Sequence, residues 1–323
     1  MILLITNKED ITTDFIVKKL SEKKIPFYRL NTEDIIRNLK IDINFKENIF
    51  TIKDSIKNEY INSDQIESVY FRRPKLPDLK DESFELGEKR FFLNEMNYFF
   101  EGIYSILNDA FWISPVFSIR KAENKIFQLV LANTIGFKIP DGIISNEIVS
   151  LNKFLNKNDN RCIIKPIKTG YIEESDSLKL IYTSDIDSEI VNKYKNTILY
   201  PTYLQSKIEK KTDIRVTVVG NKTFPAAILS QEYEETKTDW RKGTKVELKH
   251  EIIKLPEDIE NKCILITKKL DLKFGAIDLI LNENGEYIFL EINPNGQWAW
   301  IEKRLGYRIS EEIINLLINK TFE

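Results

Sequence analysis

The sequence has few of the side chains on which many enzymes build a metal centre or a nucleophile. Its 323 residues include one histidine, His250, and two cysteines, Cys162 and Cys263. A lone histidine argues against a histidine-rich metal site and against a mechanism with a histidine base. The two cysteines stand far apart among apolar residues, so we expect buried free thiols rather than a disulfide, as in a reducing cytosol.

Long apolar runs and a strong excess of one charge are also absent. The apolar opening, Met1 to Ile5, runs directly into Thr6-Asn7 and is too short for a signal peptide or a membrane span. The net charge is −2, with 42% hydrophobic and 30% charged residues, and this composition gives no overall attraction to nucleic acid or to an anionic membrane. We expect a cytoplasmic protein with no nucleic-acid or membrane partner, long enough for two or three domains.

The chemistry that is present centres on residues 274–300. Two alternating apolar runs flank Asn284-Gly285, which predicts a two-residue type I′ hairpin turn. In that register Asp278 lies directly opposite Glu291, and Asn293 falls on the same face. The opposite face is predicted to pair Ile277, Leu279 and Leu281 with Ile292, Leu290 and Ile288. Opposed carboxylates lie roughly 5 Å apart and repel each other, so we expect a cation between them.

The donors on the polar face of this hairpin indicate which cation it is. Asp278, Glu291 and Asn293 supply three oxygens with no His or Cys nearby, which favours a hard ion. Magnesium that also binds substrate phosphates is the usual partner of so few carboxylates. The sharp strand end at Pro294-Asn295-Gly296 supports this interpretation. The alternative is an ordinary hairpin with a solvated polar face.

The first third of the chain predicts a small open α/β domain. A strand over 2–5, a helix over 12–24 and a strand over 27–30 form a β-α-β unit with a parallel strand pair. Further elements are expected as a hairpin of strands 41–45 and 49–53, a strand over 66–71, and a long helix over 85–107. That helix carries aromatic residues at helical spacing, including Phe91, Phe92 and Tyr98, which more often face a core than a cofactor.

Two arginines follow the strand over 66–71. Pro74 ends that strand, so Arg72 and Arg73 lie at its carboxyl end, where open α/β sheets bind ligands. The guanidinium group matches a carboxylate or a phosphate through two parallel hydrogen bonds. The alternative is an exposed arginine pair beside a loop.

The middle of the chain contains two lysines in positions that suit phosphate binding. A helix over 120–135 carries Asn124-Lys125, and a buried strand over 161–167 ends near Lys165. The loop Lys168-Thr169-Gly170 is poor in glycine and matches no Walker pattern. The remaining elements are expected as a helix over 147–155, strands over 203–208, 213–220 and 222–231, a polar segment over 232–238, and helices over 255–270 and 310–319.

Taken in chain order, these motifs resemble the ATP-grasp superfamily. They are Asn124-Lys125, Lys165-Pro166, Gln205 to Ile208, Asp213-Ile-Arg215, Asp278 and Glu291-Ile-Asn293. The resemblance implies an α/β (α+β) ATP-grasp fold. It has an N-terminal pre-ATP-grasp open α/β domain (1–115), a small central α/β subdomain (116–200) and a C-terminal antiparallel-sheet subdomain (201–323). The implied cofactor contacts are with ATP at Lys125, Lys165, Gln205, Lys207 and Ile208, and with Mg²⁺ at Asp278, Glu291 and Asn293.

A narrower resemblance is to the ATP-grasp peptide maturases that make graspetides, the microviridin-type side-chain-cyclised peptides. Its motifs are Arg72-Arg73-Pro74, Ser230-Gln231, Asp239-Trp240-Arg241 and the run from Glu291 to Trp298. The resemblance implies a ribosomal precursor peptide as partner, with a leader and an acidic core, and it allows for a homodimer. A core Glu or Asp would be phosphorylated and then joined to Thr or Ser as an ester, or to Lys as an amide.

The resemblance also implies roles for the remaining site residues. Arg215 is expected to stabilise the γ-phosphate and the developing acyl phosphate. Asp213 is expected either to orient Arg215 or to help remove a proton from the attacking hydroxyl. Arg72, Arg73 and Arg241 are candidates to seat the acidic core side chain. The segment with Ser230, Asp239 and Trp240 is expected to clamp the leader as an exposed β-ribbon.

Two other interpretations remain open at this stage. The closer one is an ATP-grasp ligase that adds an amino acid to a peptide or small-molecule carboxylate. The other is a non-catalytic module that binds ATP or a peptide. The presence of Lys125, Lys165, Arg215 and the three metal ligands argues against a non-catalytic module.

Overall fold

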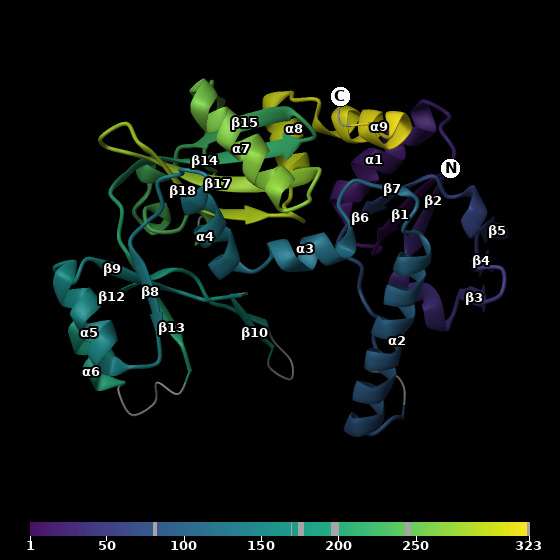
Figure 1. Cartoon of the computed structure of the whole chain (residues 1–323), viewed down its shortest axis with the longest axis horizontal. Helices are drawn as coiled ribbons and strands as arrows, with labels where there is room; N and C mark the ends of the chain where they lie inside the picture. Colours follow the sequence, from purple (N-terminus) through teal and green to yellow (C-terminus); the bar gives the residue numbers. More distant parts are fainter. Residues whose placement is uncertain (80–82, 169, 174–177, 195–199, 243–246, 322–323) are drawn as a thin grey trace.

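The computed structural model describes residues 1–79, 83–168, 170–173, 178–194, 200–242 and 247–321. In Figure 1 an N-terminal sheet, a central sheet and a C-terminal sheet form three bodies, and α3 (Val116–Ala122) runs between the first body and the other two. Both chain ends lie beside the N-terminal sheet. Thr169, in the glycine-poor loop, lies outside the described residues.

A parallel four-stranded sheet opens the chain, as the β-α-β pattern predicts. Its order is β2-β1-β6-β7, and α1 (Ile11–Glu22) connects the first two strands. The strands are β1 (Ile2–Thr6), β2 (Phe27–Asn31), β6 (Ser68–Phe71) and β7 (Phe111–Trp112). A second, antiparallel sheet follows β2 and contains β3 (Leu39–Asn44), β4 (Ile49–Asp54) and β5 (Glu59–Asn62). The short 3₁₀ turns η1 (Thr32–Ile36) and η2 (Ser63–Gln65) flank it.

The long helix α2 (Leu86–Ile106) packs on the N-terminal sheet with only its C-terminal half. Phe100, Ile103 and Tyr104 are buried in the core with residues of β1 and β6. The expectation of a core position is wrong for Phe91 and Tyr98, which are 60% and 75% exposed, whereas Phe99 packs against the same core. The first half of α2 extends past the sheet in Figure 1. Tyr98 lies in the second half but only two residues before the buried Phe100, so it points away from the core.

The central part of the chain forms a small antiparallel sheet covered on one face by two helices. Its order is β12-β9-β13-β8, and α5 (Ile148–Lys157) and α6 (Ser188–Lys193) bury Leu151, Phe154 and Val191 against it. The strands are β8 (Gly142–Ser145), β9 (Cys162–Lys165), β12 (Ser184–Ile186) and β13 (Thr202–Ser206). A separate hairpin joins β10 (Tyr171–Glu173) to β11 (Leu178–Leu180).

The C-terminal sheet is antiparallel, with the order β16-β15-β14-β17-β18. Its strands are β14 (Lys210–Val219), β15 (Lys222–Ile228), β16 (His250–Ile252), β17 (Phe274–Asn282) and β18 (Tyr287–Asn293). One apolar face packs on α4 (Lys125–Thr134) and α7 (Glu257–Lys269). The opposite face packs partly on α8 (Ala299–Leu305) and α9 (Ile309–Asn319), in a core shared with β1 and α1. The same face carries Arg215 and Asp278 of the candidate site, which pair across β14 and β17 and alternate with residues of the apolar face.

The hairpin of β17 and β18 brings Asp278 opposite Glu291, as the sequence predicts, but by a different register. The predicted type I′ turn is wrong: Leu281 pairs with Tyr287, and only Gly285, with φ of +78°, adopts a left-handed conformation in the turn. A bulge between Asp278 and Leu279 then shifts the ladder by one residue. Leu279 therefore faces Phe289 rather than Leu290, and the two deviations cancel at Asp278.

Two further sequence expectations are corrected by the fold. The helix expected over 120–135 is two helices, α3 and α4, because the side chain of Asn124 caps α4 by accepting from Phe127 N at 3.1 Å. The segment 230–242 is not a β-ribbon. It consists of three short 3₁₀ turns, η3 (Ser230–Glu232), η4 (Glu234–Thr236) and η5 (Trp240–Lys242). Both cysteines are free and buried, as expected.

Candidate active site

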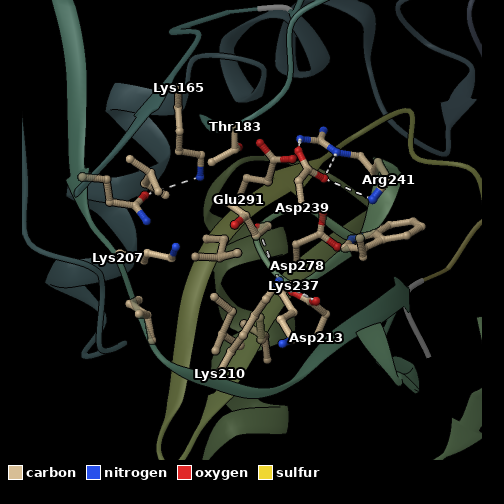
Figure 2. A pocket seen from close by; sticks show the side chains of 18 residues that line it. Lys165, Thr183, Lys207, Lys210, Asp213, Lys237, Asp239, Arg241, Asp278 and Glu291 are labelled. Carbon is tan, nitrogen blue, oxygen red and sulfur yellow. Dashed lines mark hydrogen bonds and ion pairs between the residues drawn. The ribbon is translucent and has the colours of Figure 1, made fainter. Parts of the chain in front are cut away.

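Two adjoining cavities lie between the central sheet and the C-terminal sheet. The first has an apolar wall that includes Ile163, Ile208 and Leu290. The second is strongly cationic and includes Lys125 and Lys168. The two share Lys165, Arg241 and Glu291, so they form one continuous site. Figure 2 shows Lys165 on the central sheet side, facing Glu291 on the strands of the C-terminal sheet.

The central sheet supplies Lys165 and Gln205 to the apolar cavity. Lys165 ends β9, and Gln205 lies on the neighbouring strand β13. The Gln205 side-chain oxygen accepts from Lys165 Nζ at 3.4 Å and from the Tyr203 hydroxyl at 3.2 Å. Burial lowers the pKa of Lys165 from its ordinary value, and the Glu291 carboxylate counters that effect. The lysine is therefore a buried cation that a further anion would stabilise. Ile208 and Lys207, which follow β13, line the same cavity.

The opposed carboxylates of the C-terminal sheet are each paired with a cation of the protein. The Arg215 guanidinium donates to both oxygens of Asp278, at 2.6 and 3.1 Å. Lys125 Nζ lies 3.0 Å from Glu291. Burial alone would raise the pKa of Glu291, but Lys125 and Lys165 outweigh it and lower that pKa to about 2. Burial and the neighbouring Glu291 raise the pKa of Asp278 in spite of Arg215. Cationic side chains of the protein therefore balance the repulsion between the two carboxylates.

Helix α4 delivers Lys125 to this site and is fixed there by Gln128, one turn later. Gln128 Nε2 donates to Ile292 O at 2.8 Å, and its side-chain oxygen accepts from Ile292 N at 3.0 Å. These two bonds use the backbone N–H and C=O of Ile292, the residue after Glu291. Gln128 itself is buried, with 2% of its surface exposed. Gln128 is not among the residues predicted for the site. Its signal in the sequence is a single polar residue within the apolar run from Ile126 to Ala132.

Asp213 does not contact Arg215. Its carboxylate accepts from Lys210 Nζ at 2.7 and 3.0 Å and from the Ser230 hydroxyl. Asp213 is 5% exposed and Ser230 is fully buried, and burial raises the pKa of Asp213. The expectation that Asp213 orients Arg215 is corrected, since Asp278 does so. Ser230 likewise has no exposed surface for a peptide and instead anchors the 230–242 segment to β14.

The end of the 230–242 segment forms a wall of the site. Asp239 accepts from Arg241 Nε and a terminal nitrogen, each at 2.8 Å, and both residues line the apolar cavity. Burial would raise the pKa of Asp239, but the bonds from Arg241 lower it. The Trp240 ring lies 5.7 Å from the Arg215 guanidinium and 6.1 Å from the Trp300 ring. Trp240 therefore faces Arg215 inside the site.

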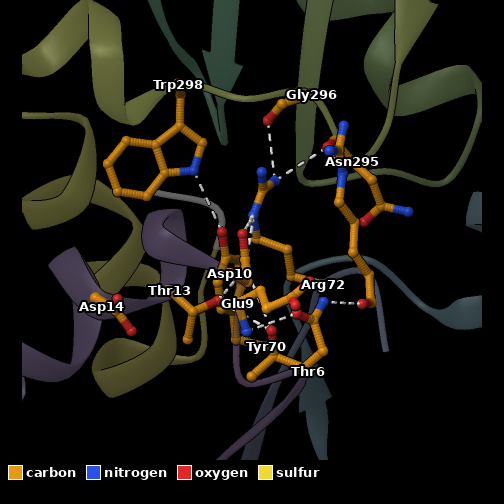
Figure 3. Close-up of polar contacts among 12 residues, drawn as sticks. Thr6, Glu9, Asp10, Thr13, Asp14, Tyr70, Arg72, Asn295, Gly296 and Trp298 are labelled. Atoms are coloured by element: carbon orange, nitrogen blue, oxygen red, sulfur yellow. Dashed lines mark hydrogen bonds and ion pairs between the residues drawn. The ribbon is translucent and has the colours of Figure 1, made fainter. Parts of the chain in front are cut away.

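Arg72 and Arg73 differ sharply in environment. The Arg72 side chain is 1% exposed and pairs with Asp10 at 3.0 Å. It also donates to Asn295 O at 3.1 Å and Gly296 O at 2.9 Å (Figure 3). Its expected role in seating a substrate carboxylate is therefore corrected: it ties the N-terminal sheet to the loop after β18. Arg73 is exposed and uses only Nε, which donates to Asn295 O at 3.0 Å.

The donor set on the C-terminal sheet fits magnesium. Asp278 lies opposite Glu291, and Asn293 lies two residues beyond Glu291 on the same face. The Asn293 side-chain oxygen also accepts from Asn295 N at 2.9 Å, which fixes its orientation. In the described parts of the chain no group of three or more His, Cys, Asp or Glu is placed to hold a metal. An all-oxygen set of two carboxylates and one amide suits an ion that completes its shell with phosphates and water.

This combination defines a class of protein. A continuous site has an apolar end, a cluster of lysines and arginines, and oxygen ligands for a hard ion. Such a site suits an enzyme that uses a nucleoside triphosphate to activate a carboxylate. In the described chain, no helix is both long enough and apolar enough to cross a membrane.

Comparison with known families identifies the class further. Residues 122–317 match the RimK-like ATP-grasp domain, and residues 1–120 match the MvdD pre-ATP grasp domain. The chain therefore belongs to the RimK-like ATP-grasp family and is an ATP-grasp carboxylate ligase, an enzyme class that uses ATP and Mg²⁺.

Solved structures of similar fold include enzymes that modify peptides. A RiPP-associated ATP-grasp ligase of Chryseobacterium gregarium, in complex with ADP and a leader and core peptide, is 28% identical with a TM-score of 0.89, covering 99% of this chain and 97% of that chain. Macrocyclase MdnB of Microcystis aeruginosa is 27% identical with a TM-score of 0.80, covering 98% of each chain. Among relatives by sequence, the alpha-aminoadipate–LysW ligase LysX of Sulfurisphaera tokodaii is 23% identical over 65% of this chain and 70% of its own.

Proposed function

We propose that the protein is an ATP-dependent macrocyclase that joins side chains within a ribosomal precursor peptide. A core Glu or Asp would be activated as an acyl phosphate and then joined to Thr or Ser as an ester, or to Lys as an amide. The precursor would carry a leader as well as this core. The three-part organisation over 1–115, 116–200 and 201–323, the cytoplasmic location and a homodimer belong to the same proposal.

The observation that carries the proposal is the set of cationic groups around the paired carboxylates. Lys168, at the cationic cavity, and the terminal nitrogens of Arg73 have no partner among the described residues. Partial burial of the Arg73 guanidinium lowers its pKa, although the residue as a whole is exposed, and the charges of Arg72 and Arg215 lower that pKa further. Two anions, a polyphosphate and a carboxylate, would balance these charges.

The residues divide between these two anions. Gln205, Lys207 and Ile208 would contact the base, and Lys125 and Lys165 would bind phosphates. Asp278, Glu291 and Asn293 would hold magnesium, which when bound neutralises phosphate charge. Arg215 would stabilise the charge that develops as the carboxylate oxygen attacks the γ-phosphate. Arg73 and Arg241 would seat the carboxylate, and Asp239 and Trp240 would support Arg241 and Arg215.

The full-length likeness to peptide-modifying enzymes supports this function over other ligase reactions. The MdnB and Chryseobacterium gregarium structures cover nearly the whole chain, including the N-terminal part. The amino-acid ligase LysX covers only 65% of it. That relative nevertheless favours a second candidate, a ligase that adds a free amino acid to a peptide or small-molecule carboxylate.

Mass spectrometry separates the two candidates. Short peptides encoded near the gene and containing Glu or Asp with Thr, Ser or Lys would be incubated with the enzyme, ATP and magnesium. Macrocyclisation removes one water for each ring formed. Addition of an amino acid increases the mass, and only when free amino acids are supplied.

A further inference from the structure

Five carboxylates line the two cavities of the site among the described residues: Glu123, Asp213, Asp239, Asp278 and Glu291. Four of them form an ion pair with a cationic side chain. The pairs are Asp213 with Lys210, Asp239 with Arg241, Asp278 with Arg215, and Glu291 with Lys125. Glu123 differs, because its side chain makes no hydrogen bond or ion pair within the described chain. It is also exposed, so a substrate can reach it.

Glu123 occupies the junction between α3 and α4. It is the C-cap residue directly after α3, and the next residue, Asn124, caps the helix that carries Lys125. Its backbone N donates to Ile119 O at 2.9 Å, so the position of the residue is fixed by the helix. It lines the cationic cavity together with Lys125, Asn293 and Pro294. Its charge also reaches Arg73, where it opposes the lowering of the pKa by burial. Glu123 thus lies on the side of the site where a peptide carboxylate would be seated.

Ring closure requires a group that accepts a proton. The hydroxyl oxygen or amine nitrogen of the acceptor attacks the carbonyl carbon of the acyl phosphate. The bond from that carbon to the phosphate oxygen breaks, and phosphate leaves with the electron pair. The acceptor must release one proton in this step. His250 lies at the sheet edge against Trp300 and Arg304 and lines neither cavity. Asp213 is enclosed by Lys210 and Ser230 in the apolar cavity.

We propose that Glu123 is the catalytic residue that receives the proton of the attacking acceptor. The inference rests on the proposed macrocyclase function and deepens it by assigning the second half of the reaction. The oxygens of the other four carboxylates are already engaged by their cation partners, whereas those of Glu123 are open to the attacking acceptor.

The test separates activation from ring closure by trapping the acyl phosphate with hydroxylamine. Hydroxylamine is uncharged near neutral pH and reacts without help from a base, so it converts the activated carboxylate to a hydroxamate that mass spectrometry detects. Wild type, Glu123→Gln, Glu123→Asp and the control Glu147→Gln, an exposed carboxylate outside both cavities, would be compared. The probes are precursor peptides with Thr or Lys as acceptor.

The expected result is that Glu123→Gln forms rings about 100-fold more slowly, the usual scale for loss of one general base. Its hydroxamate yield should stay at the wild-type level, and Glu123→Asp should recover part of the rate. Ring closure at the wild-type rate in Glu123→Gln would overturn the inference and leave the proposed function intact. Equal loss of rings and hydroxamate in Glu123→Gln would also overturn it. Absence of hydroxamate and of rings in wild type with every peptide would overturn the proposed function itself.

Discussion

Two contacts orient the Arg215 side chain, which is proposed to stabilise the charge that develops in the transition state. Both oxygens of Asp278 hold its Nε and one terminal nitrogen, and the Trp240 ring lies against its guanidinium. These contacts fix the plane of the group before substrate binds. A donor that is already oriented loses little free energy in reorganisation when the transition state forms.

Replacement of Arg215 by Ala should therefore lower kcat at saturating peptide by about 100-fold to 1000-fold, the range for loss of one preorganised donor. The peptide affinity should change little if the guanidinium acts on the transition state as proposed. Arg215→Lys should recover only part of kcat, since an ammonium group cannot form two parallel bonds to Asp278. Steady-state kinetics decide the question. Unchanged kcat with a raised KM would assign Arg215 to peptide binding instead.

The pairing of Glu291 with Lys125 and Lys165 outweighs its repulsion from Asp278 and lowers its pKa. Its folded pKa of about 2 lies below the ordinary 4.5, so its ionised form stabilises the folded state above pH 4.5. That contribution disappears as the pH falls from 4.5 toward 2. Glu291→Gln should therefore unfold about 1–3 kcal/mol more easily at neutral pH, because it leaves Lys125 and Lys165 without their anion. The difference from wild type should shrink on acidification.

Urea unfolding of both proteins across a pH series measures this effect. Glu286→Gln is the control, since Glu286 lies on the same hairpin but is half-buried, lines neither cavity and pairs with Lys138. A Glu291→Gln variant that is more stable than wild type at neutral pH would mean that carboxylate repulsion outweighs the pairing.

At the scale of the element, the loop after β18 depends on a close approach of two backbones. A Cβ placed on Gly296 would lie 2.3 Å from the Ala276 Cβ, so no side chain fits there. Arg72 holds the carbonyl of the same residue from the other side. The loop is therefore confined between β17 and the N-terminal sheet, three residues beyond Asn293, the proposed metal ligand.

Gly296→Ala should lower the free energy of unfolding by about 1–3 kcal/mol, as overpacking does, and it should also weaken magnesium-dependent nucleotide binding by displacing Asn293. Gly102→Ala is the control, because nothing lies within 4 Å of the added carbon on α2, and it should be slightly more stable than wild type. Thermal melts and calorimetry with ADP and magnesium give both quantities. Wild-type binding in a destabilised Gly296→Ala would limit the loop to a structural role.

For the hairpin of β17 and β18, only part of the structure could be predicted from the sequence. The pairing of Asp278 with Glu291 is predictable, because alternation fixes the face of each residue. The turn was predicted wrongly, because Asn284-Gly285 also suits a three-residue loop in which only Gly285 is left-handed, and a bulge then restores the register. The cations between the carboxylates could not be assigned from sequence. Lys125 comes from a helix more than 150 residues away, and its approach depends on Gln128 and on the break at Asn124.

Arg72 shows the same limit. The sequence places both arginines at a strand end, which favours ligand binding for either one. Only tertiary packing separates them, since Asp10 and the loop at Asn295-Gly296 enclose Arg72 and leave Arg73 exposed. The Arg72-Arg73 motif therefore predicts where the two side chains lie but not which of them can reach a ligand.

At the scale of the whole molecule, Arg72 joins the parallel N-terminal sheet to the catalytic part. Trp298, fully buried beside it, donates from Nε1 to the Tyr70 hydroxyl at 3.2 Å. A single apolar core continues across this junction, from Ile2 and Leu4 to Ile301 and Ile313. The N-terminal part is therefore packed as a fixed component of the site, and it carries Arg73 to the cleft.

Arg72→Met should cost about 3–5 kcal/mol of stability, because it leaves the buried Asp10 carboxylate without its cation. Arg73→Ala should melt like wild type but use the core carboxylate less well, by about 1–3 kcal/mol in kcat/KM. The double variant Asp10→Asn, Arg72→Met should recover part of the lost stability. Melting curves and kinetics on the same samples test the contrast, and an unaltered melting temperature for Arg72→Met would contradict the tethering role.

The mass of a peptide product tests the central claim most directly. Enzyme, ATP, magnesium and a neighbouring precursor peptide with acidic and Thr, Ser or Lys residues should yield a product lighter by one water for each ring, with one ADP released per ring. Hydrolysis with mild base would then distinguish ester from amide rings. A product that instead gains the mass of a supplied amino acid, or ADP release with no change in any peptide, would contradict the macrocyclase account.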